Sequence, residues 1–248
     1  MSQTDKIRAF RDLHVAGEPL VLMNVWDAGS AKVVSNAGAS ALATGSFSLV
    51  GALGYEDGEH CPKDLVLGAL RLICRATDRP VSHDSERGYG ETPAEVGEYI
   101  RSVVDAGAVG INLEDGVDSE SGLRALDEQL VRISAAKEAL GEGYLNARTD
   151  VFLLESGREM DDLIEEVITR ARAFKVAGAD GLFVPGLVDL KAINRICEAV
   201  EMPVNVMRSL DGPDISAFAD AGVARISHGP WPWRKAMSDL KTEVEALP

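Results

Sequence analysis

The sequence predicts a single α/β domain over residues 1–248, folded as a (β/α)8 TIM barrel. Eight short apolar runs each precede a segment with helical periodicity, an alternation typical of parallel β-α-β units. A short helix-to-strand turn built on an Ala-Gly pair recurs four times, at 36–40, 105–110, 176–181 and 220–225. Eight such units in about 250 residues match the usual size of this barrel.

The expected elements follow one another without a linker or a low-complexity stretch. A polar amphipathic helix is expected over 1–18, and a last helix over 231–247 carries an apolar stripe of Trp233, Met237, Leu240 and Val244. The predicted strands are 20–26, 40–46, 80–86, 109–115, 144–150, 180–186, 203–209 and 223–229. A doubly wound open sheet is the alternative fold. It usually carries a Gly-rich GxGxxG fingerprint after its first strand, and NVWDAGSA does not match this pattern.

Composition narrows the class of protein. Hydrophobic residues make up 46% of the chain, which is enough for a sizeable core, and the formal net charge is -15. Because the chain has no block of Lys and Arg, nucleic acid and anionic membranes are poor partners. The three cysteines are far apart, with no CxxC, and the N-terminus does not resemble a signal peptide. We expect a soluble cytoplasmic protein without a membrane span.

Polar residues gather at the carboxyl ends of the predicted strands, where barrels of this type carry their chemistry. The starts of the same strands are mostly apolar. The residues at the ends are Trp26 and Asp27, Gly45 and Ser46, Asp84 and Glu86, Glu114 and Asp115, Asn146, Arg148 and Asp150, Asn205 and Arg208, and Ser227 and His228. This asymmetry predicts a site at that rim of the barrel.

The acidic part of the rim predicts a metal site. Asp84 and Glu86 would share one side of their strand, because side chains alternate with a period of two, and Glu114 would complete the cluster. A hard divalent ion with oxygen ligands fits three carboxylates, so Mg²⁺ is expected, with Mn²⁺ as a substitute and zinc disfavoured. Arg148 is placed to hold a substrate carboxylate with two hydrogen bonds.

Each of these residues also has a purely structural interpretation, which the sequence leaves open. Asp84 or Glu86 is also suited to capping a loop or pairing with Arg87, and Arg148 to pairing with Glu114. His228, beside a Gly-Pro turn, is equally suited to a loop contact.

Five motifs in order, NVWDAGSA, GYEDG, DSERGYG, GINLEDG and NARTD, resemble the isocitrate lyase/phosphoenolpyruvate mutase superfamily. The resemblance spans Asn24 to about His228. It implies a (β/α)8 barrel whose last helix is swapped between protomers of a homodimer or homotetramer. It also implies Mg²⁺ and a small α-keto or α-hydroxy acid substrate that reacts through an enolate-like state.

Carried over by motif, the resemblance implies roles for individual residues. Asp84 would contact the metal, with Glu86 and Glu114 acting mainly through waters. Arg148 would face the substrate, and Asp57 of GYEDG would lie near the reacting centre, so that the catalytic candidates are Arg148, Asp57 and Glu114. The substrate-binding candidates are the backbone around Gly45, Ser46 and Phe47, together with Trp26, Asp84, Arg148, Asn205 and His228.

One segment departs from the resemblance. The relatives that cleave isocitrate or methylisocitrate carry a Lys-Cys-Gly-His loop after the fourth strand, whereas Val117–Gly122 has no Lys, Cys or His. We therefore expect a Mg²⁺-dependent lyase that cleaves a C–C bond or decarboxylates an oxaloacetate-type acid. P–C bond chemistry on a phosphonopyruvate-like substrate is one alternative. A catalytically silent protein that binds keto acids is the other.

Overall fold

The computed structural model describes residues 1–118, 122–154 and 157–248, and its centre is a parallel barrel. Its strands are β1 (Leu20–Leu22), β2 (Asn24–Val25), β3 (Leu42–Thr44), β4 (Val81–Asp84), β5 (Gly110–Glu114), β8 (Tyr144–Arg148), β9 (Gly181–Val184), β10 (Val204–Met207) and β11 (Arg225–Ser227). β1 pairs with β11 and β2 pairs with β3, so the segment 20–25 closes the sheet. This closure confirms the predicted barrel and rules out the open sheet.

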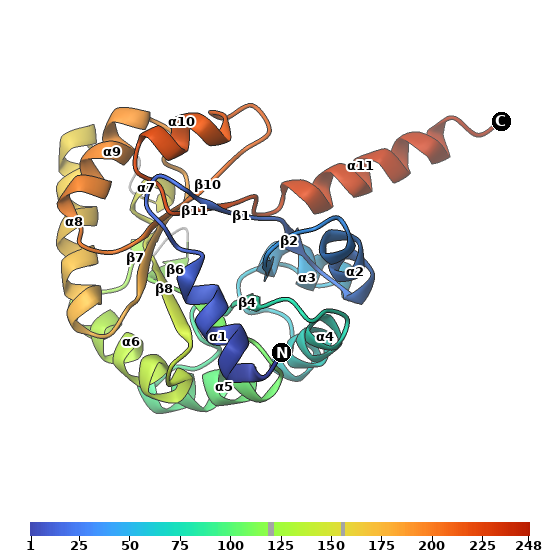
Figure 1. The fold of residues 1–248 in the computed structure, drawn as a ribbon, viewed down its shortest axis with the longest axis horizontal. Coiled ribbons are helices and arrows are strands. Elements are labelled where there is room, and N and C mark those ends of the chain that lie inside the picture. Colours follow the sequence, from blue (N-terminus) through green and yellow to red (C-terminus); the bar gives the residue numbers. More distant parts are fainter. Residues whose placement is uncertain (119–121, 155–156) are drawn as a thin grey trace.

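The strands alternate along the chain with helices, most of which cover the outside of the barrel (Figure 1). The helices between the strands are α2 (Ala28–Asn36), α3 (Ser46–Ala52), α4 (Lys63–Arg75), α5 (Pro93–Asp105), α6 (Leu126–Leu140), α7 (Val151–Leu154), α8 (Met160–Val176), α9 (Leu190–Ala199) and α10 (Ile215–Asp220). Local chemistry sets several starts. Thr92 and Glu95 form a capping box ahead of α5, and Asp27 caps α2 by accepting the N–H of Ser30 at 2.7 Å.

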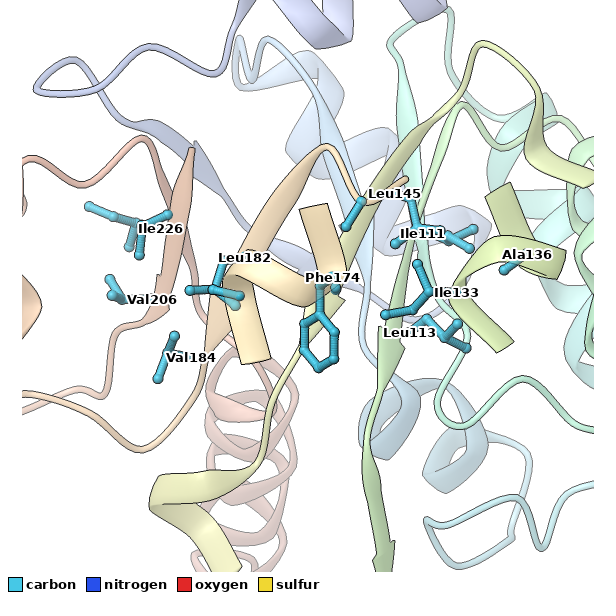
Figure 2. Packing of buried hydrophobic residues seen from close by; sticks show 14 of the residues in the cluster. Ile111, Leu113, Ile133, Ala136, Leu145, Phe174, Leu182, Val184, Val206 and Ile226 are labelled. Atoms are coloured by element: carbon cyan, nitrogen blue, oxygen red, sulfur yellow. The ribbon is translucent and has the colours of Figure 1, made fainter. Parts of the chain in front are cut away.

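The main hydrophobic core lies between the sheet and these helices. Aliphatic side chains on the outer face of the strands pack against α6 and α8. Figure 2 shows Ile111, Leu113, Leu145 and Leu182 of the strands, Ile133 and Ala136 of α6, and Phe174 of α8. A second cluster lies at the N-terminal ends of the strands, where α1 (Gln3–Asp12) inserts the fully buried Phe10. Burial of apolar surface on both sides of the sheet holds the strand ends in place.

Two elements lie outside the barrel proper. A hairpin of β6 (Gly116–Asp118) and β7 (Gly122–Leu123) follows β5. The last helix, α11 (Trp231–Glu245), extends away from the barrel (Figure 1) and buries none of its residues. Among the described residues, no helix is long and apolar enough to cross a membrane.

Candidate active site

A cavity of about 150 Å³ opens at the carboxyl ends of the strands, where the sequence predicts the site. Its polar wall comes from the ends of β2, β3, β4, β5, β8 and β11, and its apolar wall from α7 and the ends of β9 and β10. The lining residues are Asn24, Gly45, Ser46, Phe47, Asp57, Asp84, Asn112, Arg148, Leu153, Phe183, Pro185, Met207, Ser227, Gly229 and Pro230.

Asp84 ends β4 and faces this cavity. Its Oδ2 accepts the backbone N–H of Ser46 at 3.2 Å. Its Oδ1 is buried and accepts no hydrogen bond from the described residues. A buried carboxylate oxygen without a donor is costly unless a cation or water meets it. The oxygen donors of this wall therefore fit Mg²⁺, the ion expected from the sequence.

Asp57 reaches the same cavity from the loop that follows α3. Desolvation at the wall, and then the neighbouring Asp84 carboxylate, raise the pKa of Asp57. The side chain keeps a solvent-exposed side, so water screens part of this effect. A carboxyl group with a raised pKa beside a substrate cavity is suited to holding or releasing a proton.

Arg148 ends β8 between two carboxylates. Its guanidinium lies 2.7 Å from Glu114 Oε2, and it donates to Asp150 Oδ1 and Oδ2 at 2.6 and 2.9 Å. Burial raises the pKa of Glu114, and the Arg148 charge opposes that rise. Burial lowers the pKa of Arg148, but Glu114 and Asp150 outweigh it and keep that pKa well above its usual range. Arg148 therefore pairs with Glu114, as its structural interpretation predicts, and also lines the cavity.

Glu86 does not share a strand face with Asp84, which corrects the sequence-based placement. β4 ends at Asp84, and Glu86 has a left-handed φ of 48°, so the two-residue strand period no longer applies. The Glu86 carboxylate accepts the N–H groups of Gly58 and Glu59 at 3.0 and 2.7 Å and the Tyr89 hydroxyl at 2.5 Å. It thereby anchors the loop that carries Asp57.

The three carboxylates predicted to surround a metal thus each contact different protein groups. In the described part of the chain, no three Asp, Glu, His or Cys side chains are grouped to hold an ion. Direct ligation by Glu86 or Glu114 has no support in this geometry. Contact through waters, which the sequence resemblance implies for both residues, stays a prediction.

Three predicted substrate-binding residues lie outside the cavity wall. The Trp26 ring packs against the core, and its backbone N–H donates to Ser30 Oγ at 3.1 Å. Asn205 donates to Ser227 Oγ at 3.2 Å, and His228 Nδ1 lies 3.0 Å from the Leu22 carbonyl. The contact of His228 matches its structural interpretation as a loop residue.

The cavity also contains residues that the site prediction omitted. Asn112 lies two residues before Glu114 on β5, so the strand period was a usable signal for it. Leu153, Phe183, Pro185 and Met207 form the apolar wall. Apolar lining carries no sequence signal, because the same residue types fill the core.

The segment after β5 is only partly described. Arg87 donates to the Val117 carbonyl and, at 2.6 Å, to the Gly58 carbonyl, which ties the hairpin to the Asp57 loop. Residues 119–121 lie outside the described residues, so the absence of a catalytic acid in Val117–Gly122 stays a prediction.

The fold and site define an α/β-barrel protein with a carboxylate-rich pocket at the carboxyl ends of its strands. Residues 10–247 match the family model described as phosphoenolpyruvate phosphomutase. The chain belongs to this family, and its relatives confirm the resemblance to the isocitrate lyase/phosphoenolpyruvate mutase superfamily.

Individual relatives cover most of the chain. A Burkholderia cenocepacia J2315 protein with the provisional name phosphonomutase is 49% identical, covers 97% of this chain and 99% of its own, and superposes with a TM-score of 0.94. The uncharacterized protein Rv1998c of Mycobacterium tuberculosis (strain ATCC 25618 / H37Rv) is 32% identical over 91% of this chain and 83% of its own length. The 2-methylisocitrate lyase of Escherichia coli (strain K12) is 28% identical over 79% and 68%.

Proposed function

We propose that this protein is a Mg²⁺-dependent lyase that cleaves a C–C bond, or removes CO₂, from a small α-keto or 2-hydroxy dicarboxylic acid. The observation that carries the proposal is the Asp84 Oδ1 atom, which is buried and meets no donor from the described residues, in a cavity that also contains Arg148. The oxaloacetate decarboxylase among the relatives is named for an acid of this class, and the 2-methylisocitrate lyase is named for C–C cleavage of a related hydroxy tricarboxylic acid. The phosphonopyruvate hydrolase among the structural neighbours was solved with oxalate and Mg²⁺.

The residues around Asp84 would hold the ion. Asp84 would be its one direct protein ligand, with Glu86 and Glu114 reached through waters. A bound Mg²⁺ supplies a positive charge that stabilises negative charge developing on substrate oxygens. The backbone at Gly45, Ser46 and Phe47 and the Arg148 guanidinium would orient the substrate carboxylate.

The chemistry assigned to the chain is charge stabilisation and proton handling. In a keto acid, the bond to the carboxylate breaks, CO₂ leaves, and the electron pair passes into an enolate. In a 2-hydroxy acid, the hydroxyl proton passes to the Asp57 carboxylate as the C–C bond breaks, a carbonyl compound forms, and the electron pair passes into the enolate of the departing acid. Arg148, held in place by Glu114 and Asp150, is oriented before the charge appears, so it need not reorganise during the reaction. The enolate carbon then takes a proton, which we assign to Asp57 because its pKa is raised. Leu153, Phe183 and Met207 keep bulk water from the enolate.

P–C bond chemistry on a phosphonopyruvate-like substrate is the second candidate. The provisional name of the Burkholderia relative favours it. The cavity argues against it. Arg148 is the only cationic side chain among the described lining residues, and two carboxylates already neutralise it. A phosphonate group with three charged oxygens needs more donors than this wall offers.

Steady-state kinetics on a matched substrate panel tests the proposal. Oxaloacetate, 2-methylisocitrate, 2,3-dimethylmalate and phosphonopyruvate should each be assayed with Mg²⁺ and after exhaustive chelation. We expect turnover of a dicarboxylic acid only when Mg²⁺ is present. Turnover of phosphonopyruvate alone would favour the P–C alternative. Binding of these acids without turnover would favour a catalytically silent binding protein.

A further inference from the structure

Arg225 is a buried cation without a carboxylate partner in the described part of the barrel. It begins β11 and is 1% exposed. Its guanidinium lies 5.9 Å from the centre of the Phe10 ring, which closes the barrel at its N-terminal end. Its Nε and Nη1 atoms are buried and donate to none of the described residues. Burial lowers the pKa of Arg225 to about 10, so the side chain still carries its charge at neutral pH.

The one hydrogen bond that the Arg225 side chain makes to the described residues crosses the barrel. Its Nη2 donates to Asn112 Oδ1 at 3.3 Å, and β5 lies on the opposite side of the closed sheet from β11. Asn112 Oδ1 also accepts a hydrogen bond from Asn146 Nδ2 at 3.0 Å. A guanidinium has donors only, so the amide atom that faces it must be the oxygen. Two donors therefore fix the orientation of the Asn112 amide.

In this orientation, the Asn112 amide nitrogen is on the side of the cavity. Asn112 is one of the residues that line the site, at the level of Asp84 in the strand register. Its Nδ2 donates to none of the described residues, although it has two hydrogens. The floor of the cavity thus offers a preoriented donor that its neighbours do not use.

We propose that Asn112 is a substrate-binding residue, whose Nδ2 donates to a carboxylate or carbonyl oxygen of the substrate, and that Arg225 is a positioning residue that orients this amide. The inference rests on the proposed function, since it takes the substrate to be a small keto or hydroxy acid. It adds a determinant of specificity. A substrate that presents a methyl group at the floor would leave the buried donor unpaired and would bind more weakly.

Oxalate is the probe, because it has only carboxylate oxygens to present. Its dissociation constant should be measured by titration calorimetry in the presence of Mg²⁺ for the wild type, Asn112→Leu, Asn112→Asp and Arg225→Met. Asn112→Leu should weaken binding at least about tenfold, the scale of a lost hydrogen bond to a charged acceptor. Asn112→Asp should weaken binding further, because one carboxylate oxygen would replace the donor.

A double-mutant cycle separates positioning from general loss of structure. Arg225→Met should weaken oxalate binding at least about fivefold in the wild type, but change it less than about twofold in Asn112→Leu, since both act through the same amide. Arg225→Lys, which keeps the charge, should restore part of the binding. Ser82→Ala is the matched control: it removes a buried barrel hydroxyl that has no partner in the described structure, and should leave the constant unchanged.

The outcomes distinguish this inference from the proposed function. If the wild type binds oxalate and Asn112→Leu and Asn112→Asp bind it equally well, the role of Asn112 is overturned while the proposed function stands. Equal effects of Arg225→Met in both backgrounds would overturn the positioning role. If Arg225→Met does not fold, Arg225→Lys and the two Asn112 variants still decide the result. A wild type that binds no oxalate with Mg²⁺ would overturn the proposed function and this inference together.

Discussion

Arg148 lies between Glu114 and Asp150 and also borders the cavity, so in the proposed function the contacts that stabilise it would also orient it towards the substrate. Arg148→Ala should lower kcat by about a hundredfold or more, because it removes a charge aimed at the developing enolate. Steady-state kinetics on oxaloacetate-type acids, with kcat and KM reported separately, measures the effect. Arg195→Ala, at an exposed ion pair, is the control and should leave both constants unchanged. Near-normal kcat in Arg148→Ala would contradict the assignment.

Asp84 and Glu86 should differ in their effect on the metal. Asp84→Ala should weaken Mg²⁺ or Mn²⁺ binding more than Glu86→Ala, since a direct ligand contributes more than a carboxylate that acts through water. Glu86 already accepts three hydrogen bonds from protein groups. Calorimetric titration of each variant with Mn²⁺ gives the comparison.

EDTA should abolish activity, and Mg²⁺ or Mn²⁺ should restore it. Full activity after exhaustive chelation would refute the metal site.

His14 predicts a pH dependence of stability. Its ring stacks on Tyr144 at 4.0 Å and its Nδ1 lies 2.8 Å from the Phe10 carbonyl. Burial, and then the Arg225 charge, lower the pKa of His14 to about 3 from 6.5. Arg11 acts in the same direction, and Asp180 and the Phe10 carbonyl act against it.

The sign follows from proton binding, because unfolded chains protonate His14 between pH 6.5 and 3 while the folded protein does not. The stability from neutral His14 is fully present above pH 6.5 and is lost as the pH falls towards 3. The free energy of unfolding should therefore fall by up to about 1.4 kcal/mol per pH unit below that point. Urea unfolding at several pH values should show a smaller slope for His14→Phe. His60→Phe, at an exposed site, should keep the wild-type slope.

At the scale of elements, contacts within one protomer do not account for the exposed apolar side chains of α11. Its start touches the barrel, where the Trp233 ring meets Phe47 edge-on, with ring centres 5.7 Å apart. Met237, Leu240 and Val244 remain exposed. Helix α11 therefore does not cover the strands of its own barrel. The swap between protomers that the sequence resemblance implies stays a proposal.

Light scattering at micromolar concentration should give a mass of at least twice 26.4 kDa. The double substitution Leu240→Glu and Val244→Glu should shift the protein towards the monomer, because it places charges in an apolar contact. Thr242→Glu, on the opposite side of the helix, is the matched control. A wild type that is monomeric at this concentration would remove the swap.

The loops above β3, β4 and β5 form a connected support for the site. Glu86 holds the loop of Asp57, and Arg87 ties that loop to the hairpin after β5. Asp57 is therefore positioned by a network of backbone contacts rather than by a regular element. Such loops on a rigid barrel are where the chemistry of this architecture varies.

At the scale of the whole molecule, α1 closes the barrel opposite the site. Phe10 is fully buried and meets Tyr144 edge-on, with ring centres 5.7 Å apart. Phe10→Ala should lower the free energy of unfolding by about 3–5 kcal/mol, because it leaves a cavity at the end of the barrel. Urea denaturation measures the loss. Arg8→Ala, an exposed change in the same helix, should alter stability by less than about 0.5 kcal/mol. Equal stability of the two variants would contradict the closing role of Phe10.

The sequence by itself determined the eight strand-helix units, the closed parallel barrel and the rim that holds the site, because each depends on local periodicity and turn chemistry. It also placed Gly45, Ser46, Asp84 and Arg148 at that rim, since the ends of parallel strands share one edge. The resemblance to a known family added Phe47 and Asp57, and all six residues line the cavity. Only the tertiary structure decided the rest. Glu86 turned to a loop because a left-handed residue ended the strand period. The strand period already put Asn112 on the inner face of β5, but no local pattern encodes the contact of its amide with Arg225, which lies 113 residues away on the opposite side of the barrel.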